Sequence, residues 1–221
     1  MDFKQNIQVI TTNTGLQKVI VWLKALAKQS EYSGKPTPVG IDTETTGLQA
    51  HKSKILLLQL GNTKEQFVLD IHALQKLPDF NNFVEQLKTD KLLWVAHNMK
   101  FDYGMIRMNF NVELVHLVCT YLANELLIKG NKAAQSGLLD CVDKYLGVKL
   151  DKTQQSSFIG HEWGQEFTEE QLTYAGMDTV YLVPLWLKLK ELILERGLAP
   201  VAGLEFQAIK PISELEVNGI Y

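Results

Sequence analysis

Residues 39–48 read Val39-Gly40-Ile41-Asp42-Thr43-Glu44-Thr45-Thr46-Gly47-Leu48. The apolar beginning is typical of a β-strand that ends in polar residues at Asp42. Side chains alternate along a strand, so we expect Asp42 and Glu44 on the same face. Paired carboxylates on a rigid strand suit hard divalent cations such as Mg²⁺ or Mn²⁺. A solvated turn that contains a glycine is the simpler interpretation of the same residues.

The chain around this stretch alternates short apolar runs with helical patterns, without repeats or a Gly/Ser-rich linker. Further strands are predicted at Leu56–Leu60, Gln66–Asp70 and Leu92–Ala96, the first two joined by a turn at Gly61-Asn62. Helices are predicted over about 15–28, from Phe80 to Leu87, and over most of the chain after about residue 100. The predicted fold class is α/β in one domain, a mixed sheet flanked by helices.

A second group of candidate residues follows the strand that ends at Ala96. It reads His97-Asn98-Met99-Lys100-Phe101-Asp102. A charged residue after a buried strand points into the crevice where α/β folds usually bind ligands. Alternatively, Asn98 caps the next helix and Asp102 is an acid of its first turn, favoured by the helix dipole.

A third group lies on a long predicted helix. Thr168 and Gln171 have the spacing of a capping box, and the apolar pattern runs to Leu194, with a stop at Gly197. Within it, Tyr174 and Asp178 are four residues apart and share one face. A structural hydrogen bond inside an apolar helix is the alternative interpretation. Pro184 is expected to kink the helix.

Composition places limits on the class of protein. The chain has 221 residues, 46% of them hydrophobic and 21% charged, as in a soluble globular protein. It contains no apolar run of the length that a membrane span needs, and its first residues do not resemble a signal peptide. Cys119 and Cys141 are too few for a disulfide framework or a four-cysteine zinc site, so we expect a reducing, cytoplasmic setting.

Taken together, the order Asp-x-Glu, then Asp, then Tyr-x-x-x-Asp resembles the DnaQ-like 3′–5′ exonuclease superfamily, in its tyrosine-type DEDD branch. The resemblance covers roughly residues 36–195 and implies an RNase H-like fold and a two-metal mechanism with Mg²⁺ or Mn²⁺. By the motif match, the metal ligands and catalytic carboxylates would be Asp42, Glu44, Asp102 and Asp178. Tyr174 would orient the attacking water or help to deprotonate it. The branch with a histidine near the last aspartate is excluded, because Thr173 occupies that position.

The same match indicates residues that would contact substrate. Leu48 resembles an apolar residue that packs against the terminal base or sugar, and Asn98 resembles a polar residue that contacts the strand near the scissile bond. His97 is near enough to touch substrate, and Thr43 and Phe101 belong to the same two motifs. A core leucine and a helix cap are the alternatives for Leu48 and Asn98. Cys119 departs from the aspartate that many relatives show there.

Within this branch, both motifs resemble the proofreading domain of family-A, polymerase-I-type DNA polymerases. Residues 204–220 are similar to the segment that leads from such a domain into a polymerase. We therefore expect an exonuclease domain over 1–197 and a helical extension over 198–221, acting on single-stranded or frayed DNA 3′ ends beside a polymerase domain or a separate polymerase. An RNase D-like exoribonuclease is the second hypothesis. An inactive nucleic-acid-binding scaffold is the third.

The net charge of −3 at first argues against a nucleic-acid partner. However, residues 1–160 hold 18 basic and 15 acidic side chains, whereas residues 161–221 hold 4 and 10. The proposed metal ligands account for part of the acidity. Five lysines between the second and third motifs are candidates for guiding a single strand toward the metals, and a solvated lysine-rich face is the alternative: Lys129, Lys132, Lys144, Lys149 and Lys152.

Overall fold

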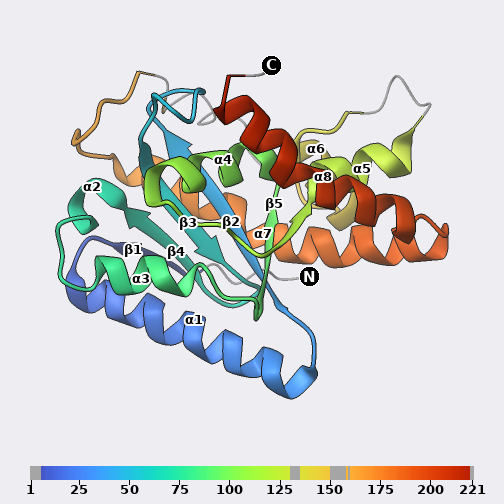
Figure 1. The fold of residues 1–221 in the computed structure, drawn as a ribbon, viewed down its shortest axis with the longest axis horizontal. Helices are drawn as coiled ribbons and strands as arrows, with labels where there is room; N and C mark the ends of the chain where they lie inside the picture. The colour runs from blue at the N-terminus through green and yellow to red at the C-terminus, as the bar shows by residue number, and fades with distance from the viewer. Residues whose placement is uncertain (1–5, 130–134, 150–157, 159, 220–221) are drawn as a thin grey trace.

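The computed structural model describes residues 6–129, 135–149, 158 and 160–219. These residues form one mixed sheet with helices on both faces (Figure 1). The strands are β1 (Ile7–Ile10), β2 (Thr37–Thr45), β3 (Ile55–Gly61), β4 (Gln66–Asp70), β5 (Leu92–Ala96) and β6 (His116–Cys119). The helices are α1 (Asn13–Ser33), α2 (Ile71–Leu74), α3 (Phe80–Gln86), α4 (Met99–Phe110), α5 (Thr120–Ile128), α6 (Leu138–Leu146), α7 (Glu169–Glu195) and α8 (Ala199–Val217).

The sheet has the strand order β1-β4-β3-β2-β5-β6. The three central strands β4, β3 and β2 are antiparallel neighbours, and β1, β5 and β6 add to them in parallel. The mixed α/β sheet predicted from the sequence is confirmed. The strand that carries Asp42 continues to Thr45, so the acidic pair lies within β2 and not beyond its end.

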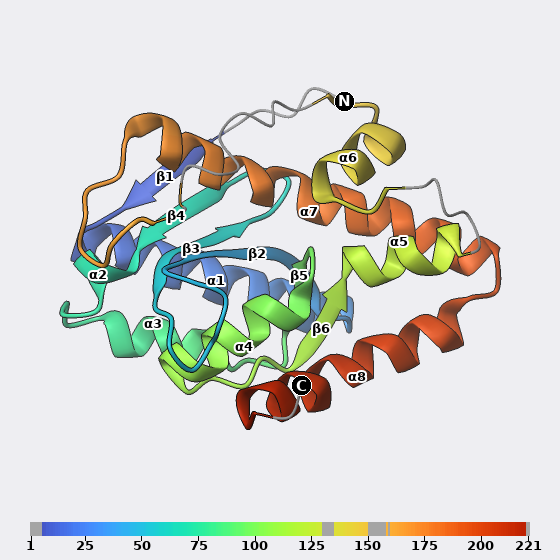
Figure 2. The same cartoon turned by 90° about the horizontal axis from the view of Figure 1, so that it is seen from above.

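Among the described residues, three hydrophobic clusters fill the space between the sheet and its helices, and the smallest contains Leu57, Val68, Phe158 and Ala175. Odd-numbered residues of β2, such as Val39 and Ile41, pack with α1 and α4 on one face. On the other face, α7 packs with α5, α6 and residues such as Val95 of β5. In the view from above, α7 and α4 lie on opposite sides of the sheet (Figure 2). The even-numbered residues of β2, Asp42 among them, therefore face α7.

Glycines let α7 lie close to this face. A Cβ atom at Gly40 would lie 3.2 Å from Leu182 Cβ, and one at Gly61 would lie 2.9 Å from Thr179 Oγ1. A Cβ atom at Gly176 would lie 2.5 Å from Cγ2 of Ile7, too near for any real side chain. The close packing of α7 on the strands thus depends on glycine, which has no side chain, at these three positions.

The long helix begins as predicted. The Thr168 hydroxyl accepts from the backbone N–H of Gln171, and the Gln171 side chain accepts from the backbone N–H of Thr168, so the capping box is confirmed. Gly197, two residues after the helix, adopts φ +68, as a stop requires. The helix continues through Pro184, and a kink there stays a prediction.

Two strands of the sheet were not predicted from the sequence. β1 and β6 are four residues long and lie at the two edges of the sheet. Runs of four residues are too short to show a strand periodicity, and each forms only because a distant strand offers an edge to pair with. Among the described residues, no helix combines the length and apolar character that crossing a bilayer requires.

Candidate active site

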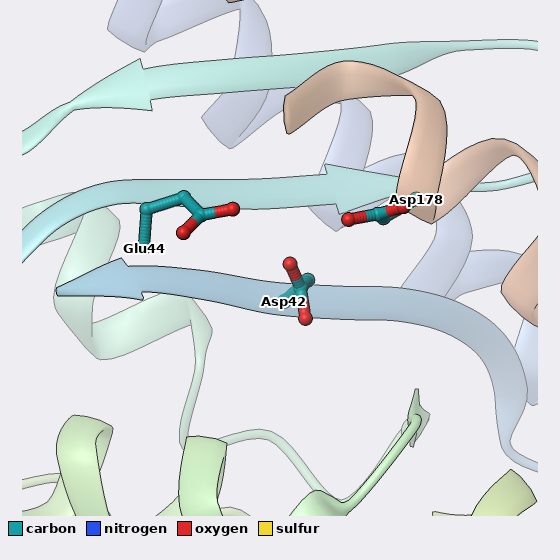
Figure 3. Close-up of side chains that lie close together, drawn as sticks. All are labelled: Asp42, Glu44 and Asp178. Carbon is teal, nitrogen blue, oxygen red and sulfur yellow. The ribbon is translucent and has the colours of Figure 1, made fainter. Parts of the chain in front are cut away.

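Three of the predicted carboxylates meet at the surface between β2 and α7. One oxygen atom from each of Asp42, Glu44 and Asp178 lies within 4.8 Å of the other two. Figure 3 shows the carboxyl groups of Glu44 and Asp178 on either side of Asp42. Two of these side chains come from one strand and the third from a helix more than 130 residues later in the chain. Strand alternation and the close approach of α7 together produce the cluster.

The fourth carboxylate, Asp102, lies in the first turn of α4. It is 2% exposed, and its Oδ1 accepts a hydrogen bond of 2.8 Å from the Thr43 hydroxyl. Its charge still reaches the others, because it contributes to the raised pKa of Asp42 and Glu44. Asp102 is therefore near the three-carboxylate cluster, but it does not belong to the group whose oxygens all lie within 4.8 Å of one another.

Burial and mutual repulsion favour the protonated form of the four acids. Burial is the largest cause of the raised pKa of Asp42, followed by repulsion from Asp102, Asp178 and Glu44. Burial raises the pKa of Glu44 to about 8, with further contributions from Asp178 and Asp102. Burial also raises the pKa values of Asp102 and Asp178 to about 7. Such crowding is stable as carboxylate only beside positive charge.

The donor set fits a divalent cation. All three clustered groups offer carboxylate oxygen, the ligand that hard cations prefer. Oxygens on opposite sides of one Mg²⁺ ion lie about 4.2 Å apart, so a spacing within 4.8 Å needs only small rotations. The raised pKa values of the four acids indicate that the site lacks the positive charge that would stabilise its carboxylates. A bound cation would supply that charge.

Tyr174 lies one helical turn before Asp178 on α7 and is half-buried. Burial and the neighbouring charges of Asp178, Glu44 and Asp42 raise the pKa of its phenol. Its hydroxyl therefore stays protonated at neutral pH. The structure brings it into the electrostatic reach of all three clustered carboxylates.

The residues predicted to contact substrate differ in their exposure and in their contacts. Leu48 is 85% exposed, so the core-leucine interpretation is wrong. With Phe101, Leu48 lines a pocket of about 100 Å³ that also involves Lys100 and Ser213. Asn98 is the N-cap residue of α4, as the helix-cap interpretation predicted, but it is exposed at φ 67 and its side chain makes no capping hydrogen bond. It lines a second pocket, of about 240 Å³.

Thr43 and His97 have partners within the protein. Thr43 is buried and holds Asp102, as described above, and its contact with substrate stays a prediction. The Nδ1 atom of His97 lies 2.9 Å from Thr120 Oγ1, and its ring meets the Tyr121 ring edge to face at 5.8 Å. Burial lowers the pKa of His97 to about 4, so the ring is neutral near pH 7.

The predicted lysine-rich guide is only partly described. Lys132 and Lys152 lie outside the described residues. The Lys144 ammonium lies 4.6 Å from the centre of the Tyr145 ring, and Lys149 is exposed. None of these contacts tests a role in guiding a strand. Cys119 and Cys141 are both buried and free.

Helix α8 lies within the helical extension predicted over 198–221, but its packing beside the site was not predicted. It packs along α4 and supplies residues to both pockets. The Lys100 ammonium lies 2.6 Å from Glu216, and Arg107 Nε donates to Glu214 at 3.0 Å. The Ser213 hydroxyl donates to the carbonyl of Lys100 at 3.4 Å.

Known proteins resemble this chain in sequence and in fold. The sequence model of a family described as 3′–5′ exonuclease matches residues 7–194. DNA polymerase I of Aquifex aeolicus is 26% identical over 99% of this chain and 36% of its own length. Ribonuclease D of Serratia proteamaculans is 24% identical over 90% of this chain and 48% of its own length. The chain thus spans a third to a half of these curated relatives.

Solved structures of NrnC from Brucella melitensis have the same fold. One shows a TM-score of 0.73 and 29% identity, covering 83% of this chain and 86% of that one. A second NrnC structure contains bound Mg²⁺, at a TM-score of 0.71 and 27% identity. A third is bound to pGG, at a TM-score of 0.70 and 25% identity.

Proposed function

The chain belongs to the 3′–5′ exonuclease family whose model matches residues 7–194, and from this premise we propose that it removes nucleotides from single-stranded or frayed 3′ ends of DNA. As a member of this family it is a hydrolase of phosphodiester bonds. The observation that carries the proposal is the meeting of Asp42, Glu44 and Asp178 within 4.8 Å. A scaffold that only bound nucleic acid would have no need to crowd three acids on one face.

The carboxylates would hold divalent cations, for which Mg²⁺ in a similar structure is a precedent. When bound, two such ions stabilise the attacking and leaving oxygens of an in-line displacement. Asp42, Glu44 and Asp178 would be the principal ligands, and Asp102 would complete the set from α4. The partial burial of Asp42, Glu44 and Asp178 reduces the screening of their charges by water, which strengthens the electrostatic interactions in the site.

Tyr174 would position the attacking water without accepting its proton. A phenol whose pKa is raised is a poor base, but it donates a hydrogen bond at any pH near neutrality. Leu48 and Phe101, which line one pocket, would pack against the terminal base, and the exposed Asn98 would contact the strand beside it. The resemblance implies two roles for Tyr174, and the raised pKa of its phenol supports orientation of the water.

The preference for DNA is supported by the match to DNA polymerase I, which extends over 99% of this chain and so includes α8. We propose that residues 1–197 are the exonuclease unit and that 198–221 form its extension. The contacts of Glu214 and Glu216 with α4 support an extension that docks on the catalytic unit.

RNA is the second candidate substrate, and a specific observation favours it. NrnC is similar over most of both chains and has been solved bound to pGG, and ribonuclease D matches 90% of this chain. A protein distinguishes the two sugars by contacts to the 2′-hydroxyl.

Digestion of matched substrates tests the proposal. Single-stranded DNA and RNA of one sequence, each labelled at the 5′ end, are incubated with the protein and Mg²⁺ or Mn²⁺, with pGG as a short third substrate. Stepwise shortening of the labelled DNA at a higher kcat/KM than the RNA is the expected result. Faster loss of RNA or pGG would assign the site to RNA, and loss of label from the 5′ end would contradict the polarity.

A further inference from the structure

A buried amide without a partner lies directly beside the carboxylate cluster. Gln59 is 0% exposed, and neither its Nε2 nor its Oε1 atom has a hydrogen-bond partner among the described residues. Buried amides are nearly always paired, because an unpaired one loses its bonds to water without replacement. Leucine or methionine would fill the same space without this penalty. The position therefore calls for an explanation.

The register of the sheet places Gln59 against Asp42. The two residues are direct partners in the antiparallel pair of β2 and β3, so their side chains leave the sheet on the same face. Directly opposed residues have Cβ atoms roughly 5 Å apart. A glutamine side chain is long enough to reach a carboxylate over that distance.

The turn of α7 that carries Asp178 covers this same point. Leu57, two residues before Gln59, packs with Ala175, and Gly61, two residues after it, has Thr179 directly above. Gln59 lies between these contacts, under the residues 175–179. Its amide is thus enclosed by the strand of one proposed metal ligand and the helix of another.

We infer that Gln59 is a positioning residue for the metal site, an inference that rests on the proposed function. When Asp42 gives one oxygen to a cation, its other oxygen needs a hydrogen-bond donor to hold the carboxylate in place. The Nε2 group of Gln59 donates that bond. An amide suits this position because it stabilises a carboxylate without adding a charge of its own to a crowded acidic site.

Direct measurement of Mn²⁺ binding to the full chain tests the inference apart from activity. Gln59→Met keeps an unbranched side chain of similar length and removes the amide. We expect its dissociation constant for Mn²⁺, measured by calorimetry, to rise about 10-fold to 100-fold. Its kcat should fall with little change in KM, and its melting temperature without metal should be equal to that of the wild type or higher.

Trp94→Phe is the matched control. Trp94 Nε1 is also buried without a partner, but its register neighbour is Val39, on the opposite face of the sheet from Asp42. This variant should bind Mn²⁺ as the wild type does. Equal Mn²⁺ affinity in Gln59→Met and wild type, or an equal loss in the control, would overturn the inference.

The outcomes separate this inference from the proposed function. A wild-type chain that binds no Mn²⁺ would contradict the proposed function itself. If Gln59→Met does not fold, the crystal structure of the wild type with Mn²⁺ decides, because Gln59 Nε2 should then lie within about 3.2 Å of an Asp42 oxygen. A Mn²⁺ complex without this hydrogen bond would refute the role of Gln59.

Discussion

The Thr43 hydroxyl donates a 2.8 Å hydrogen bond to Oδ1 of Asp102, joining β2 to the first turn of α4. Thr43 leaves the strand on the face opposite to Asp42 and Glu44. One short segment of β2 therefore positions three acids, two through its own side chains and one through this bond. The bond also lowers the pKa of Asp102 against the effect of burial.

Removal of this hydroxyl should impair both stability and activity. Thr43→Val keeps the shape of the side chain but leaves Asp102 buried without its partner, at a cost of about 1–3 kcal/mol in the free energy of unfolding. The pKa of Asp102 should rise further, moving the acid limb of the pH–rate profile of kcat to higher pH. Urea unfolding and that profile measure the two effects. Thr43→Ser restores the hydroxyl and should recover most of both.

Without divalent cations, the protein should lose stability as the pH rises from about 4 to 8. The folded state raises the pKa of Glu44 to about 8 and those of Asp102 and Asp178 to about 7, whereas the unfolded chain has ordinary values near 4. Within this window the folded state binds more protons than the unfolded state, so the free energy of unfolding falls with increasing pH. Melting temperatures in EDTA at pH 5 and pH 8 check the direction.

Added Mg²⁺ or Mn²⁺ should reverse this loss at pH 8 more strongly than at pH 5, because protons compete with cations for the same oxygens. Asp178→Asn removes one of the titrating groups and should flatten the dependence in EDTA. A melting temperature in EDTA that rises between pH 5 and pH 8 would contradict the electrostatic description of the site.

Tyr174→Phe should lower kcat and leave the metal site intact. Without the hydroxyl the attacking water is less well oriented, which costs about 10-fold to 100-fold in rate. The affinity for Mn²⁺ should not change, because the phenol is not a proposed ligand. Single-turnover digestion and calorimetry measure the two quantities. Tyr32→Phe, at a tyrosine that is 81% exposed on α1, is the control and should be neutral. A parallel loss of Mn²⁺ affinity would show that Tyr174 acts through the ions.

Leu48→Ala should affect substrate binding but not folding. The side chain is 85% exposed, and substitutions at such positions usually change stability by less than about 0.5 kcal/mol. The KM for a single-stranded oligonucleotide should rise several-fold, because an apolar contact with the terminal nucleotide is lost. A large drop in melting temperature with an unchanged KM would mean that Leu48 packs inside the protein.

Gly176→Ala should destabilise the fold although alanine favours helices. The new Cβ would lie 2.5 Å from Ile7, so β1 or α7 must move, at about 1–3 kcal/mol. Asp178 lies two residues farther along the same helix, so a shift of α7 should also lower kcat. Gly203→Ala on α8 meets nothing within 4 Å and should stabilise the protein by about 0.5–1 kcal/mol. The double variant with Ile7→Ala should recover part of the loss if crowding is the cause.

Much of the architecture was predictable from local patterns. The strands Leu92–Ala96 and Gln66–Asp70 and the capping box at Thr168 appear where periodicity and turn residues placed them. These features are settled by neighbouring residues, so a single sequence displays them. The edge strands β1 and β6 were missed because each depends on a partner strand that is distant in the sequence.

In the candidate site too, some features were predictable from the sequence and others depended on the tertiary structure. The sequence alone determined the acidic motifs and their order. It also determined the shared face of Asp42 and Glu44, because strand and helix periodicity act over a few residues. Tertiary structure alone decided that Asp102 is held by Thr43, 59 residues away, that Leu48 is exposed, and that Gln59 lies opposite Asp42. Such contacts depend on strand register and on how closely α7 approaches the sheet, and both are determined by the packing of the whole domain.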